Sequence, residues 1–234
     1  MKKLLVLLFS LFFLSSPSVF ADDISDLSIE GISIGDSLLD YMTEDEILEG
    51  LEFTKDWYSF LKEPNKYGEV EIKKNFSKYD YVTAYVINNL ADMYIADTNE
   101  LYTIPGIRES IQYVGNTNLN EYVSNKNEKY KILAIRASIY FPQDFDNCIK
   151  ERDKIVEIFS KILSSAEKSE YYASHSADPS GDSIIDTVYL DKSYEGSRYS
   201  CIDWGESISS KNNWVDNLSI SLRTEEITSW FSDY

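Results

Sequence analysis

Few residues of this chain have a type and spacing that could do chemistry, and Ser37 and His175 are the first to consider. Ser37 lies in the run Gly35-Asp36-Ser37-Leu38, and His175 is the single histidine of the sequence. A serine hydroxyl is a weak nucleophile that needs a general base within hydrogen-bonding reach. Paired as nucleophile and base, the two residues could hydrolyse an ester.

The four residues around Ser37 resemble the nucleophile block of the GDSL esterases, and that resemblance implies Ser37 as a nucleophile. The family has a parallel α/β fold and carries its histidine near the C-terminus, three residues after an aspartate. Here Tyr172 stands three residues before His175. Ser37 and Asp40 also have the Ser/Thr-x-x-acid spacing that opens helices. We interpret the match as a helix cap, predict no catalytic residue and no cofactor, and keep a Ser37 esterase as the alternative.

His175 is followed by acidic residues that could form a metal site. With Asp178, Asp182 and Asp186 it offers the ligand types that calcium or a transition metal takes. The spacing matches no EF-hand loop, and the intervening Asp-Pro and Ser-Gly pairs are common turn formers. We therefore predict a polar turn here and no bound metal.

Three tyrosines, Tyr79, Tyr81 and Tyr85, are the candidate ligand-binding residues. They fall on one face of a strand predicted over 79–87, and small apolar residues occupy its other face. One core cannot explain both faces. Either a helix or the segment 88–129 covers the tyrosines, or they are exposed and stack on a ligand such as a sugar or a peptide.

The two cysteines, Cys148 and Cys201, predict a disulfide if the protein is exported. Cys148 falls on the apolar face of a predicted helix, and Cys201 in the middle of a predicted strand.

The first 21 residues have the features of an export signal. Lys2 and Lys3 precede an apolar run over 4–14, and Val19-Phe20-Ala21 places small residues at a cleavage site. The run is shorter than the roughly 20 residues that span a bilayer. We expect a mature chain over 22–234 with no transmembrane segment, exported to the periplasm or, alternatively, to the medium.

Acidic residues dominate the charge of the chain. There are 22 Lys+Arg against 40 Asp+Glu, a net charge of −18. Removing the signal takes two lysines away, so the mature chain carries 20 − 40 = −20. Such a surface repels phosphate backbones and anionic headgroups, which argues against nucleic-acid binding and membrane adsorption. A cationic or an envelope partner fits the net charge better.

The order of predicted elements indicates an α+β fold with a mainly antiparallel sheet. Predicted strands follow one another over 183–190, 198–204 and 214–222, after earlier ones at 29–34, 79–87 and 131–141. A long helix, predicted from 144–146 to about 168, packs on one face. Further helices are predicted over 43–62 near the N-terminus and after Thr224 at the C-terminus. We expect a single domain over 22–234, with 88–129 as an inserted excursion.

Several short stretches resemble an uncharacterised group of small exported proteins of marine bacteria. They are Glu30-Gly31-Ile32-Ser33-Ile34-Gly35-Asp36-Ser37-Leu38-Leu39-Asp40-Tyr41, Cys148-Ile149-Lys150-Glu151-Arg152-Asp153, Asp178-Pro179-Ser180-Gly181-Asp182-Ser183, Cys201-Ile202-Asp203-Trp204 and Trp214-Val215-Asp216-Asn217-Leu218. The resemblance implies export and a common fold and carries over no activity. From the sequence we expect an exported soluble protein, either a non-catalytic binding protein or a structural protein of the cell envelope.

Overall fold

The computed structural model describes residues 23–57, 67–87, 129–192, 195–232. The predicted signal segment, and the excursion except its last residue, lie outside the described residues. Within them the fold is α+β, as the sequence predicts, with one seven-stranded antiparallel sheet and one two-stranded sheet.

The large sheet has the strand order β3-β4-β5-β9-β8-β7-β6, and all of its neighbouring strands are antiparallel. Its strands are β3 (Tyr67–Glu71), β4 (Tyr81–Ile87), β5 (Ile132–Tyr140), β6 (Glu167–Ser174), β7 (Ile184–Lys192), β8 (Glu195–Asp203) and β9 (Asn217–Arg223). Strands β6, β7, β8 and β9 are neighbours in both the sequence and the sheet, and β9 pairs with β5 on its other side. The C-terminal strand therefore joins the two halves of the sheet.

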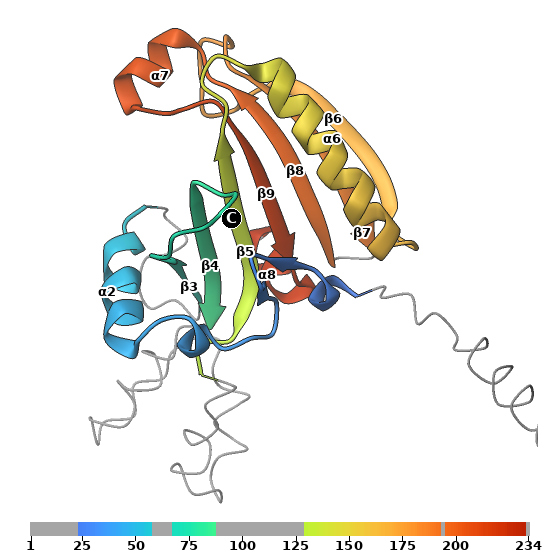
Figure 1. Ribbon diagram of the computed structural model, residues 1–234. Coiled ribbons are helices and arrows are strands. Elements are labelled where there is room, and N and C mark those ends of the chain that lie inside the picture. The colour runs from blue at the N-terminus through green and yellow to red at the C-terminus, as the bar shows by residue number, and fades with distance from the viewer. Residues whose placement is uncertain (1–22, 58–66, 88–128, 193–194, 233–234) are drawn as a thin grey trace, which may run out of the picture.

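Helix α6 (Phe145–Ile162) covers one face of the sheet over β8 and β9 (Figure 1). Asp144, rather than Asp146, caps its first turn by accepting the N–H of Asn147. Its apolar side joins alternate residues of β9 in the main core; Cys148, Ile155, Val156, Leu218, Ile220 and Leu222 are all buried there.

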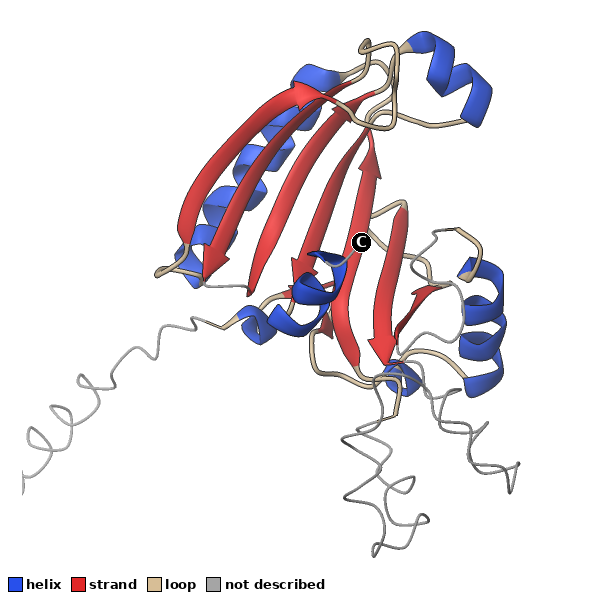
Figure 2. Cartoon of the chain, turned by 180° about the vertical axis from the view of Figure 1, so that it is seen from behind, coloured by secondary structure: helices blue, strands red, loops and turns tan. Residues whose placement is uncertain are grey.

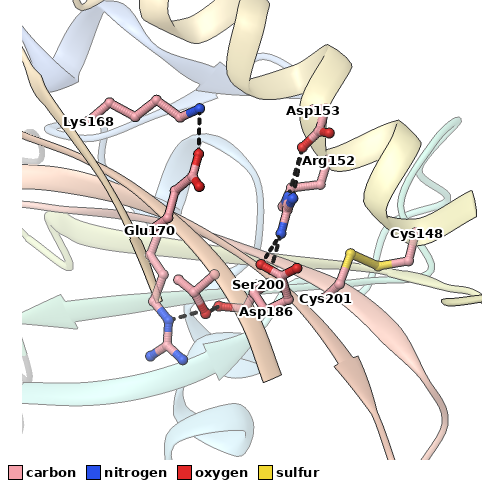
Figure 3. Close-up of polar contacts among 10 residues, drawn as sticks. Cys148, Arg152, Asp153, Lys168, Glu170, Asp186, Ser200 and Cys201 are labelled. Atoms are coloured by element: carbon pink, nitrogen blue, oxygen red, sulfur yellow. Dashed lines mark hydrogen bonds and ion pairs between the residues drawn. A yellow bond between two sulfur atoms is a disulfide. The ribbon is translucent and has the colours of Figure 1, made fainter. Parts of the chain in front are cut away.

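A disulfide and an ion pair connect α6 to the sheet (Figure 3). Cys148 and Cys201 form a disulfide, which confirms the predicted pair. One turn further along, buried Arg152 donates to Asp186 on β7 at 2.6 Å and to Asp153 at 2.9 Å. Both links lie on the face of the sheet that α6 covers, and they hold the helix against it.

Helix α8 (Glu225–Ser232) lies on the opposite face, at the end of the sheet formed by β3, β4 and the start of β5 (Figure 2). Ile227 is fully buried in a second cluster there with Tyr67, Tyr85 and Leu133. Helix α2 (Glu44–Thr54) packs beside β3 at the edge of the sheet, and its Thr43–Glu46 capping box forms as predicted. None of the described helices is long and apolar enough to cross a membrane.

The N-terminal segment forms a tight hairpin rather than the single strand predicted over 29–34. Strands β1 (Ser28–Ile29) and β2 (Ile32–Ser33) pair across Glu30 and Gly31, which have φ angles of 53° and 81°. Two consecutive positive φ values are the requirement of the two-residue hairpin turn. Short 3₁₀ turns, η2 (Ile24–Asp26) and η3 (Leu38–Asp40), flank the hairpin.

Three further predicted boundaries are wrong. The long helix ends at Ile162 rather than near 168, because β6 begins at Glu167. β6 is an edge strand exposed along nearly its whole length, so it lacks the apolar alternation that identifies a strand in sequence. β3 begins at Tyr67, within 64–68, where a proline and a glycine predict a turn that ends the preceding helix. The helix predicted over 43–62 ends at Thr54, and 58–62 lie outside the described residues.

Helix α7 (Glu206–Asn212) connects β8 to β9 and has no buried residue. The sequence analysis did not predict it, because it lacks an apolar face.

Candidate ligand-binding face

Ser37 is buried and occupied by structural hydrogen bonds. Its side chain is 3% exposed. Oγ accepts the N–H of Leu39 at 3.3 Å, which caps η3, and donates to the carbonyl of Lys129 at 2.7 Å. Ser37 therefore has the capping role predicted for it. The N–H that it accepts belongs to Leu39, one residue before Asp40.

The structure does not bring Ser37 and His175 together. Ser37 pairs with Lys131, immediately before β5 begins, whereas His175 follows β6 at the other end of the sheet. At about 3.4 Å per residue, the two ends of β5 alone are about 27 Å apart. His175 is thus far outside hydrogen-bonding reach of Ser37, and an esterase at Ser37 would need a different base.

The predicted metal candidates form a polar turn. Asp178 accepts four hydrogen bonds, from the N–H and Oγ of Ser180 and from the N–H and Oγ of Ser183, at 2.6–2.9 Å. These bonds, those from Ser183 and Ser180 first, lower the pKa of Asp178 from 3.8 to about 2. Among the residues that the structure describes, no group of three or more His, Cys, Asp or Glu side chains could hold a metal ion.

The three candidate tyrosines do not share one surface. Tyr85 is buried beneath α8, with its ring 5.2 Å from that of Phe231 and its hydroxyl donating to Glu69 Oε2 at 2.8 Å. Tyr79 precedes β4 and packs against the main core under α6. Tyr81 is half-buried and lies opposite Ser138 of β5. Of the three, only Tyr81 borders the surface described next.

The face of the sheet opposite α6 carries no helix over β9, β8, β7 and β6 beyond the region of α8 (Figure 2). We call this surface the open face. Directly paired residues of antiparallel strands project to the same side, so the strand register defines it. Its members are Ala134, Arg136, Ser138 and Tyr140 of β5, Asn217, Ser219, Ser221 and Arg223 of β9, Gly196, Arg198, Ser200 and Ile202 of β8, Ile185, Thr187, Tyr189 and Asp191 of β7, and Glu167, Ser169, Tyr171 and Ala173 of β6.

Arginines gather on the open face. The chain has five arginines, Arg108, Arg136, Arg152, Arg198 and Arg223, and three of them lie here. Ser221 lies between Arg136 and Arg198 along one row of the sheet. A guanidinium offers up to five N–H donors in a planar fork that matches carboxylate, sulfate or phosphate oxygens. The open face therefore concentrates donors for anions in an otherwise acidic protein.

Arg198 is the arginine most available to a ligand. Its Nε donates to Ser200 Oγ at 2.9 Å, which directs the side chain along β8 toward Trp204. Its guanidinium lies 5.9 Å from the centre of the Tyr189 ring. Within the described part of the chain, no carboxylate forms an ion pair with Arg198.

The other two arginines have acidic neighbours. Arg136 forms a salt bridge with Glu69 at 2.7 Å, below α8. Arg223 lies opposite Gly196, and Asp191 pairs with the other side of the same glycine. Burial and then the charge of Arg198 lower the pKa of Arg223, which places the two guanidinium groups close enough to repel. The Nε of Arg223 is buried with no hydrogen-bond partner among the described residues.

Three aromatic rings lie beyond the ends of β6 and β8. The ring of Trp204 is 4.4 Å from that of His175 on one side and 4.4 Å from that of Trp214 on the other. We call these three residues the aromatic end. Trp214 is 37% exposed. Burial and then the charge of Arg198 lower the pKa of His175.

A hydrogen-bonded turn fixes His175 and Trp204 in place. The N–H of His175 donates to the Ser183 carbonyl, and Ser183 Oγ, held by Asp178, accepts the N–H of Gly205. The glycine is required, because a Cβ at position 205 would come within 2.9 Å of Asp182 Cβ. The four hydrogen bonds that Asp178 accepts thus hold Ser183, which in turn positions Gly205, the residue after Trp204.

Trp214 is positioned by the end of α7. Asn213 adopts a left-handed conformation with φ 55° and ψ 37°, which ends the helix and turns the chain back. The N–H of Trp214 then donates to the Ser209 carbonyl, and Ser209 Oγ donates to the Trp214 carbonyl at 2.7 Å. The end of the short polar helix α7 therefore sets the position of Trp214.

Neither the open face nor the aromatic end is predicted from the sequence. A signal was present for Arg136, which alternates with apolar residues in a predicted strand. Nothing in the sequence indicated that β9 would insert between β5 and β8 and place Arg136, Arg198 and Arg223 together.

No protein-family model, curated protein or solved structure matches this chain.

Proposed function

We propose that this protein is an exported, non-catalytic binding protein that takes an anionic ligand on the open face of its sheet. The observation that supports this most directly is Arg198, a half-buried guanidinium on a helix-free surface, with no ion-pair partner among the described carboxylates. The disulfide fits an oxidising compartment. The surface offers donors and rings and no nucleophile–base pair, which favours binding over hydrolysis.

The net charge of −18 does not preclude an anionic ligand. At physiological ionic strength the Debye length is about 8 Å, so solvent-exposed carboxylates further away are largely screened. A guanidinium that contacts the ligand directly is screened far less and forms charge-assisted hydrogen bonds. The acidic remainder of the surface is where the cationic or envelope partner predicted from the sequence would bind.

The test compares anion binding in two matched variants. Arg198→Gln removes the charge and retains a donor near Ser200, and Lys154→Gln removes a charge from an exposed position on α6. We would measure the melting temperature with sodium sulfate, phosphate and citrate, against sodium chloride of equal ionic strength. At a ligand concentration 100-fold above Kd, binding stabilises the fold by about 2.7 kcal/mol, several degrees for a domain of this size.

We expect at least one of these anions to raise the melting temperature of the wild type and of Lys154→Gln, and to have a smaller effect on Arg198→Gln. Equal responses in the two variants would contradict the proposal. So would a stabilisation produced by spermidine and by none of the anions.

A further inference from the structure

The open face and the aromatic end form one continuous surface. Trp204 follows Ile202 on β8, in the alternate positions that project to the open face, and His175 follows Ala173 on β6 in the same way. Arg198 reaches along β8 toward them through its bond to Ser200. Cationic donors and stacked rings therefore adjoin on one side of the sheet.

Three of the six exposed aromatic rings in the described part of the chain lie on this surface; the other three are Phe53 and Trp57 at the end of α2 and Tyr172 on the other face of β6. Tyr140 is 44% exposed at the end of β5, Tyr171 is 52% exposed on β6, and Trp214 is 37% exposed at the aromatic end. Tyrosine and tryptophan combine a wide apolar ring with a polar group, and so suit ligands that have both an apolar face and hydroxyls. Hydroxyls of Ser138, Ser219 and Ser221 line the rows between these rings.

We propose that the ligand is an acidic glycan, a sugar ring of which stacks on Trp214 and whose anionic groups bind Arg198. This inference rests on the proposed function and specifies its ligand. A pyranose ring has an apolar face of C–H groups bounded by hydroxyls, which matches an exposed tryptophan beside serine-lined strands. An acidic group on the sugar then meets the guanidinium fork in bidentate geometry.

The form of the surface favours a chain over a small molecule. The open face extends along β8 from Arg198 to Trp204, and at about 3.4 Å per residue this distance is about 20 Å. A sugar unit is shorter than this distance, so Arg198 and Trp214 would bind different units of one oligosaccharide. The hollow lined by Ile24, Leu163 and Leu190 has a volume of about 10 Å³, the space of a single water, and offers a substrate no room.

Two kinds of acidic sugar could supply the anionic group that binds Arg198: uronic acids, which carry a carboxylate, and sugars that carry a sulfate ester. We would titrate the wild type with a tetragalacturonate, a sulfated carrageenan tetrasaccharide and neutral maltotetraose, and measure Kd by calorimetry. Trp214→Ala tests the stacking, and Trp57→Ala is its matched control. Trp57 has a nearly equal exposure of 39% and lies beyond the end of α2, outside the open face.

We expect one or both acidic tetrasaccharides to bind the wild type and Trp57→Ala equally. Trp214→Ala should bind about tenfold more weakly, and maltotetraose should bind more weakly than the acidic probes. The better of the two acidic probes identifies the source of the anion.

Two results would overturn the inference and leave the proposed function standing. One is equal affinity of Trp214→Ala and Trp57→Ala for the acidic probes. The other is an acidic tetrasaccharide that binds no more tightly than sulfate or citrate, while Arg198→Gln still loses anion binding. If Arg198→Gln and Lys154→Gln bind every anion equally, the proposed function fails as well.

Discussion

Asp216 holds the backbone of Trp204: its Oδ1 accepts the N–H of Trp204 at 2.8 Å. Its other oxygen, Oδ2, accepts the N–H of Gln143 at 2.9 Å, where the chain has a positive φ of 57° between β5 and α6. Its backbone carbonyl accepts the N–H of Phe141. One residue before β9 thus connects the aromatic end to the start of the helix on the other face.

Replacing Asp216 with alanine should loosen the aromatic end. The N–H groups of Trp204 and Gln143 both lose their acceptor. Gln143 is exposed, so water can replace the acceptor there, whereas the part-buried N–H of Trp204 left unpaired costs about 1–3 kcal/mol. We expect a lower free energy of unfolding in urea and a red shift of the tryptophan emission. An emission spectrum identical to that of the wild type would show that Asp216 does not position Trp204. Asp146→Ala, at an exposed carboxylate on α6, is the control.

The disulfide should account for a large part of the stability. It closes a loop with a sequence separation of 53 residues, for which chain entropy predicts about 4 kcal/mol. We expect no free thiol in the denatured, unreduced protein. The Cys148→Ala/Cys201→Ala double variant should unfold at a markedly lower urea concentration. Two reactive thiols in the unreduced wild type would refute the bond.

Helix α8 should depend on Ile227. This side chain is fully buried against the sheet, and Ile→Ala at such positions costs 2–5 kcal/mol. We expect Ile227→Ala to lower the free energy of unfolding by about 3 kcal/mol. Ile158→Ala is a chemically identical change at a side chain that is 56% exposed on α6, and it should stay within about 0.5 kcal/mol. Similar losses in the two variants would mean that α8 does not dock as described.

Ser37 should behave as a structural residue. Ser37→Ala removes a cap and leaves the Lys129 carbonyl without its donor, so we expect a loss of about 2 kcal/mol. Ser37→Asp, a good cap at exposed sites, should be worse here, because a buried carboxylate cannot donate to that carbonyl. Short-chain aryl esters should show no turnover. Turnover that both Ser37→Ala and His175→Ala abolish would instead establish the esterase.

Because of the turn at Asp178, the stability of the fold should depend on pH in the acid range. Hydrogen bonds from Ser183 and Ser180 lower the pKa of Asp178 from 3.8 to about 2. A carboxylate with a lowered folded-state pKa stabilises the fold above its unfolded pKa, and this contribution is lost as the pH falls through the folded value. The difference in melting temperature between the wild type and Asp178→Asn should be constant above pH 5 and shrink between about pH 4 and 2. A difference that does not change over that range would contradict this assignment.

The sequence by itself determined the features that depend on local patterns. Alternation in 79–87 and 131–141, the helix periodicity after Asp144 and the caps at Ser37, Thr43 and Asp144 specified the elements and the α+β class. The disulfide is predicted from the presence of two cysteines, one on a predicted helix and the other on a predicted strand. Edge strand β6 escaped prediction, since both of its faces are polar and exposed.

Only the tertiary structure decided which residues meet. Arg198 and Arg136 are 62 positions apart, and both lie opposite Ser221 because β9 inserts between β5 and β8. His175 is brought to Trp204, and not to Ser37, by the register of β6, β7 and β8. Strand order and register are set by the burial of one face of the sheet under α6 and of part of the other face under α8, a long-range balance that no local spacing encodes.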